Sequence, residues 1–391
     1  MTQTQMTQTL TRRSFLSLTA ASLVARRLGA ADTGTSPLVY IGTTTRKAGD
    51  GIHVGRWNPQ SGTLSEVRIA FECISPSFLA ITRRRNVPLL FAGYQTDRKT
   101  GGLSGFRIDP SGALKLINTV PAAGADFVHL ALDHTEGCLI AANYGQGSIL
   151  SCKVDPAGHL SGFVSQIQLS GHGPISSRQA SPHAHGAAIS PNNRFVYIND
   201  LGTDRIFIYK LNAATAELVA NDPPFLSMAA GSGPRHLVFH PNGRWAYCIN
   251  ELNSTISFLH WNSASGALLV VANTPPMVPA GDVANNRAGE LAFDANARFL
   301  YACNRGAAED LLTFSVGTDG RLTFVSRLQT AGKEARHFIV SPDDGYLLVA
   351  EQFSNEVAVF ARDRHTGILK PTSASYPVDS PSCIVRGLSN H

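Results

Sequence analysis

The chain has 391 residues, of which 43% are hydrophobic and 16% charged, and it holds 35 glycines and 21 prolines. Its formal net charge of +5 comes largely from four arginines in residues 1–31, a segment without acidic side chains: Arg12, Arg13, Arg26 and Arg27. The rest of the chain is nearly neutral, so neither nucleic acid nor a membrane surface is an expected partner.

Residues 1–31 resemble a targeting signal. The stretch TRRSFL at residues 11–16 is a twin-arginine pattern, and the apolar run from Leu16 to Ala25 is too short to span a bilayer. Small residues at positions 29–31 offer a cleavage site. We therefore expect a twin-arginine-type signal peptide over residues 1–31, recognised by the twin-arginine export machinery, and a periplasmic or secreted domain over residues 32–391. Without a functional signal, the expected location is the cytoplasm.

A short β-rich phrase recurs seven times along the chain, with spacings of 51, 49, 57, 50, 54 and 47 residues. Its central residues, used below as anchors, are Tyr40, Phe91, Ile140, Tyr197, Tyr247, Tyr301 and Leu348. A repeat of this length indicates a solenoid, a propeller or an array. No unit shows an apolar period of 3.6 residues, which excludes a helical solenoid.

The unit around Tyr247 reveals the strands within each repeat. Alternating and apolar stretches separated by turn residues predict four strands there, at 234–240, 245–250, 255–261 and 268–272. Four antiparallel strands in each of seven repeats predict an all-β fold, a seven-bladed β-propeller.

The two ends of the chain predict how the ring closes. The first anchor lacks the strand that precedes every other anchor, whereas residues 380–385 repeat the form of residues 75–80. We expect the C-terminal strand to pair with the N-terminal strand in one blade and to become its innermost strand. Such closure joins the first blade to the last and leaves no open sheet edge between them.

Polar side chains recur where the innermost strand begins and where its neighbour ends, two points that meet at one mouth of the channel. Twelve residues before an anchor stand His185, Arg235 and Arg336, and His183 lies on the same strand face as His185. Eleven residues before an anchor stand His129, His236, Glu290 and His337, and four residues after an anchor stand Glu251 and Arg305. We expect one site at this rim.

Two structural alternatives stand beside this expectation. Arg235 and Glu251 could form a structural ion pair, and the histidines eleven residues before an anchor could bond within or between blades. His183 and His185 have the HxH spacing of metal ligands, but the sequence offers no third ligand, so we expect neither a metal nor a cofactor. The six cysteines show no metal-binding spacing. We expect them to be buried, and a disulfide stays possible.

Five separated motifs resemble the lactonase seven-bladed propeller family, which includes propeller-type 6-phosphogluconolactonases and fungal carboxymuconate cyclases. They are SPHAH at 181–185, NDLGTDRI at 199–206, GPRHL at 233–237, NELNST at 250–255 and NRG at 304–306. The resemblance covers about residues 37–386. It implies a small lactone or carboxylate substrate and a catalytic set of His183 or His185, Arg235, Glu251 and Arg305.

The resemblance implies hydrolysis by direct attack of water, since no GxSxG nucleophile motif occurs. We expect Glu251 as general base, His185 as proton shuttle, and Arg235 and Arg305 as anion or oxyanion binders. The expected substrate-binding residues are His183, His236, Glu290, Arg336 and His337. The same rim suits a muconate-type cycloisomerase, and a non-catalytic binding propeller is the alternative of another class.

Two places depart from the family pattern. Residues 294–297 (DANA) replace the usual turn that contains Pro and Gly, which we expect to weaken that turn. Glu351-Gln352 stands where the family has Asn-Gln. We expect this exchange to touch the rim and to alter the shape of the substrate site.

Overall fold

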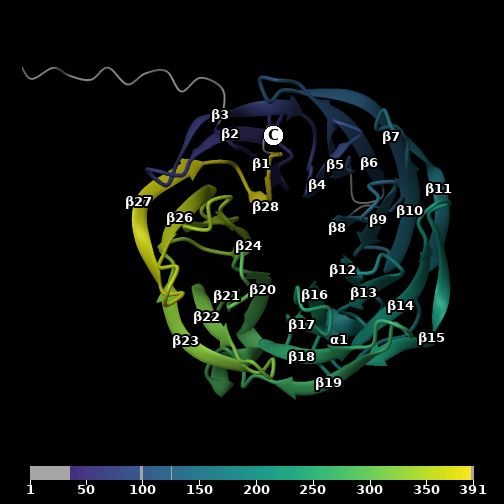
Figure 1. Cartoon of the computed structure of the whole chain (residues 1–391), viewed down its shortest axis with the longest axis vertical. Coiled ribbons are helices and arrows are strands. Elements are labelled where there is room, and N and C mark those ends of the chain that lie inside the picture. The colour runs from purple at the N-terminus through teal and green to yellow at the C-terminus, as the bar shows by residue number, and fades with distance from the viewer. Residues whose placement is uncertain (1–35, 97–99, 125, 389–391) are drawn as a thin grey trace, which may run out of the picture. The chain divides into compact units, whose positions relative to one another are not determined.

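Seven antiparallel sheets of four strands each lie around one axis in the computed structural model (Figure 1), which describes residues 36–96, 100–124 and 126–388. The seven-bladed propeller is therefore confirmed. The expected signal peptide at 1–31 lies outside the described residues. The described residues hold no helix that is long and apolar enough to cross a membrane.

Each blade begins with an innermost strand at the channel, and its other three strands follow outward. The first three blades are β28 (Pro381–Arg386), β1 (Leu38–Thr43), β2 (Gly51–Asn58), β3 (Thr63–Glu72); β4 (Phe78–Arg84), β5 (Val87–Gln95), β6 (Thr100–Ile108), β7 (Leu114–Ala123); and β8 (Phe127–Leu132), β9 (Cys138–Asn143), β10 (Ser148–Val154), β11 (Leu160–Gln168).

The other four blades are β12 (Ala184–Ile189), β13 (Phe195–Asp200), β14 (Arg205–Asn212), β15 (Glu217–Ser227); β16 (Pro234–Phe239), β17 (Trp245–Asn250), β18 (Thr255–Trp261), β19 (Leu268–Asn273); β20 (Asn286–Phe293), β21 (Phe299–Gly306), β22 (Asp310–Val316), β23 (Leu322–Gln329); and β24 (Ala335–Val340), β25 (Tyr346–Glu351), β26 (Glu356–Arg362), β27 (Leu369–Pro377). The connections hold a short helix, α1 (Ser176–Gln179), and a 3-10 helix, η1 (Ala280–Asn285).

The ring closes as the two chain ends predict. β28 pairs antiparallel with β1, with Ile384 opposite Ile41 and Val385 opposite Tyr40. The innermost strands contact one another in the order β28, β4, β8, β12, β16, β20, β24 and back to β28. The C-terminal strand therefore completes the first blade and also bridges the second and the seventh.

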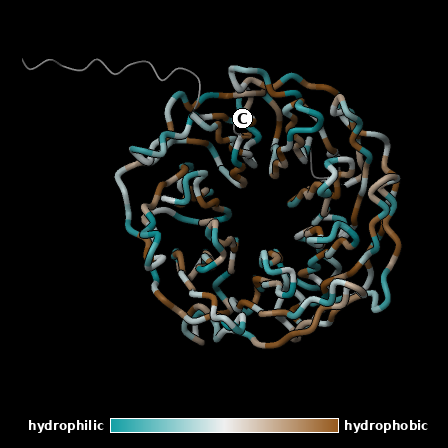
Figure 2. The backbone as a smooth tube through the Cα atoms, viewed as in Figure 1, coloured by the Kyte–Doolittle hydropathy of each residue, from teal (hydrophilic) through white to brown (hydrophobic). Residues whose placement is uncertain are grey.

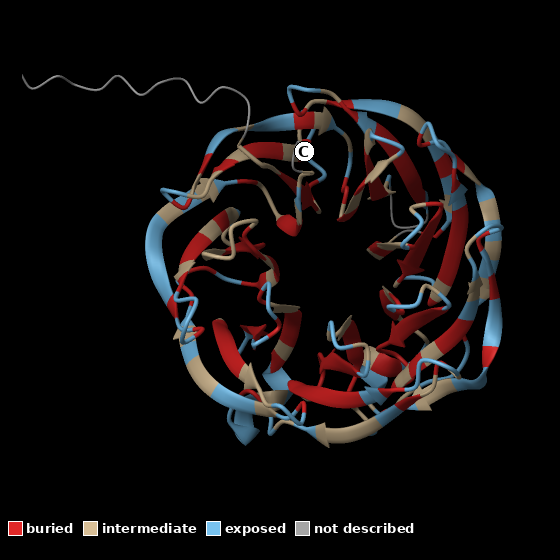
Figure 3. Cartoon of the chain, viewed as in Figure 1, coloured by how far each residue is buried: buried red, intermediate tan, exposed pale blue. Residues whose placement is uncertain are grey.

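Burial follows the distance of a strand from the axis. Figure 3 shows buried residues in the inner strands and exposed residues on the outermost strands, and Figure 2 shows hydrophobic segments in sheets all around the ring. The second strands β9, β13 and β17 are buried along their whole length. Such strands are covered on both faces by neighbouring blades, so their apolar side chains form the inter-blade core.

The four anchor tyrosines tie their own blades to the next blade. Tyr197 donates its hydroxyl proton to the Gly266 carbonyl at 2.6 Å, and Tyr247 donates to the Gly320 carbonyl at 2.6 Å. Both glycines lie in turns of the following blade at positive φ, and a Cβ on Gly266 would lie 2.5 Å from the Phe195 ring. The repeat therefore carries an inter-blade bond that depends on glycine.

The turn at residues 294–297 forms without the expected glycine. Ala297 adopts φ 51°, and the Asp294 carboxylate accepts hydrogen bonds from the backbone N–H groups of Arg298 and Phe299. Asp294 also pairs with the buried Arg362 guanidinium at 2.6 Å. These bonds offset the cost of a left-handed alanine.

Glu351 ends β25 and is absent from the lining of the rim cavity described below, so the expected effect of this exchange on substrate shape stays a prediction. Its carboxylate is buried beneath Gly332, where an added Cβ would lie 1.3 Å from Glu351 Oε2. Burial, reinforced by the nearby Glu356 carboxylate, raises the pKa of Glu351 to about 7.

The six cysteines, all among the described residues, are free thiols.

Glu351→Gln should make stability less dependent on pH. A carboxyl whose folded pKa is raised contributes full stability below about pH 4.5, and this contribution is lost as the pH rises through about 7. Chemical denaturation should therefore show the variant to be more stable than the parent near pH 8 and similar near about pH 5. Glu217→Gln, at an exposed position of β15, is the control. The same response in both variants would contradict this account of Glu351.

Candidate active site

A β-bulge stands at the second residue of four innermost strands and turns its side chain toward the channel mouth. The pairing register shifts around Val128 in β8, His185 in β12, Arg235 in β16 and Arg336 in β24. A bulge leaves its extra residue unpaired and re-aims that side chain. All four residues stand twelve before an anchor, which explains why this position supplies the rim.

The centre of the site is the buried carboxylate of Glu251, which directly follows β17. Its Oε2 lies 2.7 Å from Arg305 Nη2 and 3.2 Å from Arg235 Nε, and its Oε1 lies 2.5 Å from Arg178 Nη2. Arg305 belongs to β21 and Arg178 to α1. One anion therefore holds three arginines that come from separate parts of the chain.

A second carboxylate extends this network. Glu334 Oε1 accepts from Arg305 Nη1 at 2.6 Å, and Glu334 Oε2 accepts from Arg287 Nη2 at 2.7 Å. Both terminal nitrogens of Arg305 are thus engaged by carboxylates, one from each side. This fixes the plane of the guanidinium group.

The charges around Glu251 weigh against the expected role as general base. Burial alone would raise the pKa of Glu251, but Arg305, Arg235 and Arg178 outweigh it and lower the pKa to about 2. A carboxylate that is so stabilised, with both oxygens facing guanidinium groups, accepts a proton poorly. Glu251 instead acts as the anionic anchor of the site.

His185 lies beside this anchor as a neutral ring. Its Nε2 is 3.9 Å from Glu251 Oε2, beyond hydrogen-bond range. Burial lowers the pKa of His185 well below its usual value, and the charge of Arg235 lowers it further. The ring therefore stays uncharged near neutral pH, with a free electron pair on one of its two nitrogens.

A cavity of about 520 Å³ opens over these groups. It is lined by Asp126, Val128, Tyr144, Arg178, His185, Glu251, Arg287, Arg305, Glu334, Arg336 and Phe353. The lining holds four arginines and three carboxylates, and Arg235 behind Glu251 adds a fifth arginine. The site therefore has a formal excess of two positive charges. Arg336 forms no ion pair with any residue in the described part of the chain. Its guanidinium is available to an anion.

Three of the expected substrate-binding residues form a separate layer. Glu290 Oε2 lies 2.8 Å from His236 Nδ1 and 3.4 Å from His337 Nε2, and none of the three lines the cavity. His129 packs on His236 with ring centroids 4.7 Å apart. The position eleven residues before an anchor thus supplies bonds between blades, in line with the structural alternative.

His183 is separated from His185. Its ring stacks on Tyr144 with centroids 4.4 Å apart, its Nδ1 lies 3.0 Å from the Tyr144 carbonyl oxygen, and it is absent from the cavity lining. His183 therefore lies at the edge of the site, and His185 lies in its interior. Among the described residues, no group of three or more His, Cys, Asp or Glu side chains is arranged to hold a metal ion.

Three residues of the network, Arg178, Arg287 and Glu334, were not predicted from the sequence, and of these Arg178 and Glu334 lie outside the repeated strands. Arg178 sits on α1, in the extra residues that make the third spacing the longest, at 57. Glu334 precedes β24 by one residue. The long third spacing indicates an insertion that could have drawn attention to Arg178. Nothing in the repeat points to Glu334.

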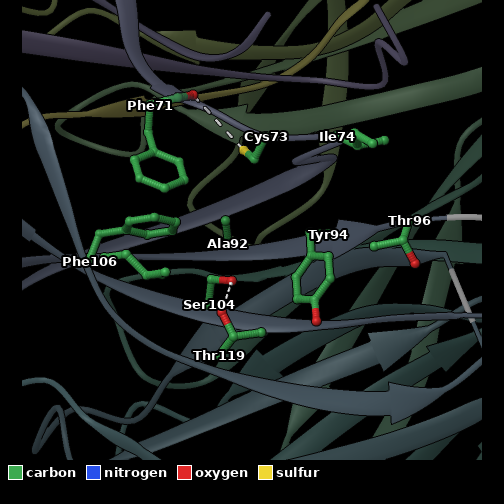
Figure 4. A pocket seen from close by; sticks show the side chains of 10 residues that line it. Phe71, Cys73, Ile74, Ala92, Tyr94, Thr96, Ser104, Phe106 and Thr119 are labelled. Atoms are coloured by element: carbon green, nitrogen blue, oxygen red, sulfur yellow. Dashed lines mark hydrogen bonds between the residues drawn. The ribbon is translucent and has the colours of Figure 1, made fainter. Parts of the chain in front are cut away.

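A second cavity, of about 290 Å³, lies among β3, β5, β6 and β7 (Figure 4). Its described lining is mostly apolar, with Phe71, Phe106 and Tyr94 facing it, and none of these described residues is charged. It therefore lacks the acid, base and anion-binding groups that the rim cavity has.

Comparisons with known proteins agree with the motifs. A family model described as "Lactonase, 7-bladed beta-propeller" matches residues 38–386. A 6-phosphogluconolactonase of Formosa agariphila is 31% identical over 352 residues, which cover 88% of this chain and 98% of that protein. A 6-phosphogluconolactonase of Bacillus subtilis is 29% identical over 352 residues, 90% and 98% of the two chains. The solved periplasmic gluconolactonase of Pseudomonas aeruginosa has a TM-score of 0.84 at 32% identity, over 90% of this chain and 99% of that one.

Glu251→Gln should destabilise the fold because it leaves three arginines without their shared counter-ion. Removal of one partner of a buried ion pair costs about 3–5 kcal/mol. Urea denaturation near neutral pH should show such a loss, and the gap between parent and variant should close as the pH falls from about 4.5 through about 2, where Glu251 protonates.

The matched control for this experiment is Glu66→Gln. Glu66 pairs with Arg56 at 3.0 Å, but its side chain is 63% exposed. Its removal should cost less than about 1 kcal/mol. A loss in Glu251→Gln no larger than in this control would contradict the role of Glu251 as anchor.

Proposed function

The chain belongs to the seven-bladed β-propeller lactonase family, and we propose that it hydrolyses the ring ester of a sugar lactone of the 6-phosphogluconolactone type. The observation that carries this proposal is that one cavity holds both a neutral His185 and an Arg336 guanidinium that forms no ion pair within 4.0 Å with the described residues. Ester hydrolysis needs a group that accepts a proton from water, and an anionic substrate needs a cation that no protein carboxylate occupies.

In the proposed reaction, water attacks the lactone carbonyl carbon and passes a proton to His185 Nε2. The partly exposed Arg178 stabilises the carbonyl oxygen as it becomes negative, and Arg305, whose terminal nitrogens are held by carboxylates, contributes through its positive charge alone. The ring C–O bond then breaks, and His185 returns the proton to the alkoxide oxygen. Arg235, which bonds the Gly289 carbonyl at 2.6 Å, supports Glu251 from behind instead of binding substrate.

The electrostatics of the cavity support an anionic substrate. The formal excess of two positive charges raises the local concentration of anions and their rate of association. A phosphate or carboxylate substituent on the sugar supplies two or more acceptor oxygens for the fork of Arg336. Phe353, 68% exposed at the rim, presents an apolar face to the sugar ring.

We also propose that the protein is exported. The support is the twin-arginine pattern at residues 11–16, outside the described part of the chain, and the similarity to the periplasmic gluconolactonase of Pseudomonas aeruginosa. Recognition of the precursor by the twin-arginine export machinery belongs to the same proposal.

A panel of lactones should reveal turnover by the purified protein. The panel contains 6-phosphogluconolactone, gluconolactone and a muconolactone, each followed by proton release with and without a chelator. We expect hydrolysis of a sugar lactone that survives chelation, because His185 and the arginines supply the required groups. Turnover of the muconolactone alone would favour the cycloisomerase, and no turnover of any member would favour a binding propeller.

Arg336→Gln should separate anion recognition from ring opening. Loss of a charge-assisted hydrogen bond corresponds to about a tenfold or larger rise in KM for the phosphorylated lactone. The KM for neutral gluconolactone should change much less. Arg68→Gln, at an exposed position of β3, is the control. Equal changes in KM for both substrates would contradict the role given to Arg336.

A further inference from the structure

Beneath the cavity lies a layer of buried rings that the proposed reaction does not use. His236 Nδ1 lies 2.8 Å from Glu290 Oε2, and the backbone N–H of Leu291 donates to Glu290 Oε1 at 2.9 Å. His236 Nδ1 also lies 3.2 Å from Arg235 Nη1, which only donates, but the carboxylate contact at 2.8 Å is the shorter, so we assign the His236 proton to Nδ1. In a neutral ring this makes His236 Nε2 an acceptor.

Two ring nitrogens in this region have no hydrogen-bond partner within the described residues. They are His236 Nε2 and His185 Nδ1, and both are fully buried. The two rings lie 5.2 Å apart between centroids. An added Cβ on Gly186 would lie 3.2 Å from His236 Cδ2, the carbon next to Nε2, so this edge of the ring faces β12, the strand of His185.

Buried polar atoms in native proteins are almost always satisfied, if not by the protein then by an internal water. Two nitrogens on neighbouring rings, each lacking a protein partner in the described part of the chain, are the setting in which one water bridges both. The other nitrogen of His185, Nε2, has no acceptor among the described residues to which it could donate a proton. Glu251 Oε2 is 3.9 Å away and already faces Arg305 and Arg235.

We propose that a buried water joins His236 Nε2 to His185 Nδ1, and that the Glu290–His236 pair thereby positions His185 as its Nδ1–H tautomer with a bare Nε2 toward the cavity. The water donates one proton to His236 Nε2 and accepts the Nδ1–H of His185. All hydrogen bonds then run in one direction, from His185 through the water and His236 to Glu290. The proposal rests on the lactone hydrolysis proposed above.

This arrangement gives the proton transfer a defined course. As the water–carbon bond forms, the proton of the attacking water moves to His185 Nε2, and the ring becomes an imidazolium. The hydrogen-bonded chain places the Glu290 carboxylate behind that positive charge, and no proton needs to leave Nδ1, as in a serine-hydrolase triad. When the ring C–O bond breaks, the Nε2 proton passes to the alkoxide oxygen. His236 and Glu290 are therefore positioning residues.

The surroundings keep both rings neutral before reaction. Burial lowers the pKa of His236 well below its usual value, and Arg235 on its own strand lowers it further. The titratable and charged groups that face His236 from packed elements are His129 on β8, His185 on β12, Glu290 on β20, Arg305 on β21, and Arg336 and His337 on β24. Glu290 is the one anion of this set, and His236 is bonded directly to it.

The tautomers can be measured on the unmodified protein. Nitrogen-15 NMR of histidine-labelled full-length protein reports which ring nitrogen carries the proton. We expect Nδ1–H for both His236 and His185 near neutral pH, with exchangeable Nδ1 protons. An Nε2–H tautomer at His185 would overturn the proposal, and this result does not depend on whether any variant folds or on which substrate is used.

Kinetics of His236→Asn test the consequence for the reaction. Asn retains a donor toward Glu290 but lacks the acceptor at the Nε2 position. We expect kcat to fall about tenfold or more with little change in KM. We also expect kcat, corrected for uncatalysed hydrolysis, to rise with pH in the variant between about pH 6 and 8, because attack by hydroxide replaces base-assisted attack by water, and to stay flat in the parent.

The matched control is His129→Asn. His129 lies in the same ring layer, but its Nδ1 accepts the Ala187 N–H at 3.4 Å and takes no part in the relay. Its kcat and pH profile should follow the parent. Equal losses in both variants, or a flat pH profile in His236→Asn, would overturn the positioning role. Absence of lactone turnover in the parent would instead refute the proposed function, while the NMR result would still decide the tautomer.

Discussion

The buried carboxylate of Glu251 is the interaction on which the site depends. Arg178, Arg235 and Arg305 come from a connecting helix and two different blades, and without a shared anion their charges would repel at the channel mouth. Glu334 forms a second ion pair with Arg305, on the side of Arg305 opposite Glu251. The cost of burying these charges is offset only because each carboxylate oxygen meets a guanidinium nitrogen. The propeller thus holds an excess of positive charge in a fixed geometry.

The bulges of the innermost strands connect this chemistry to the fold. In a regular strand, residues twelve and eleven before an anchor would point to opposite faces. The extra residue at the bulge frees His185 and Arg336 to face the cavity, while His236 and His337 remain in the ladder and bond between blades. One local irregularity, repeated around the ring, therefore produces two layers: an outer layer with the cavity groups and an inner layer of hydrogen-bonded rings.

Much of the fold could be predicted because its determinants recur in the sequence. The seven anchors, the four strands around Tyr247 and the closure by residues 380–385, observed as β28, all follow from the period and from the form of the two ends. The site was harder to predict. His185, Glu251, Arg305 and Arg336 could be placed at one mouth, but the bulges that separate them from His236, Glu290 and His337 have no signature in residue type. Arg178 lies in a connection that the repeat does not describe. The role of Glu251 depends on how many cations face it, which is a property of the assembled ring.

The account is tested most directly by an experimental structure of the protein with 6-phosphogluconate, the product of the proposed reaction. We predict that an anionic group of this ligand contacts Arg336, that another part of it lies within hydrogen-bond distance of His185 Nε2, and that Glu251 keeps its arginine contacts. A ligand bound elsewhere, such as in the apolar cavity beside Phe71 and Tyr94, with the Arg336 cavity left to solvent, would contradict it.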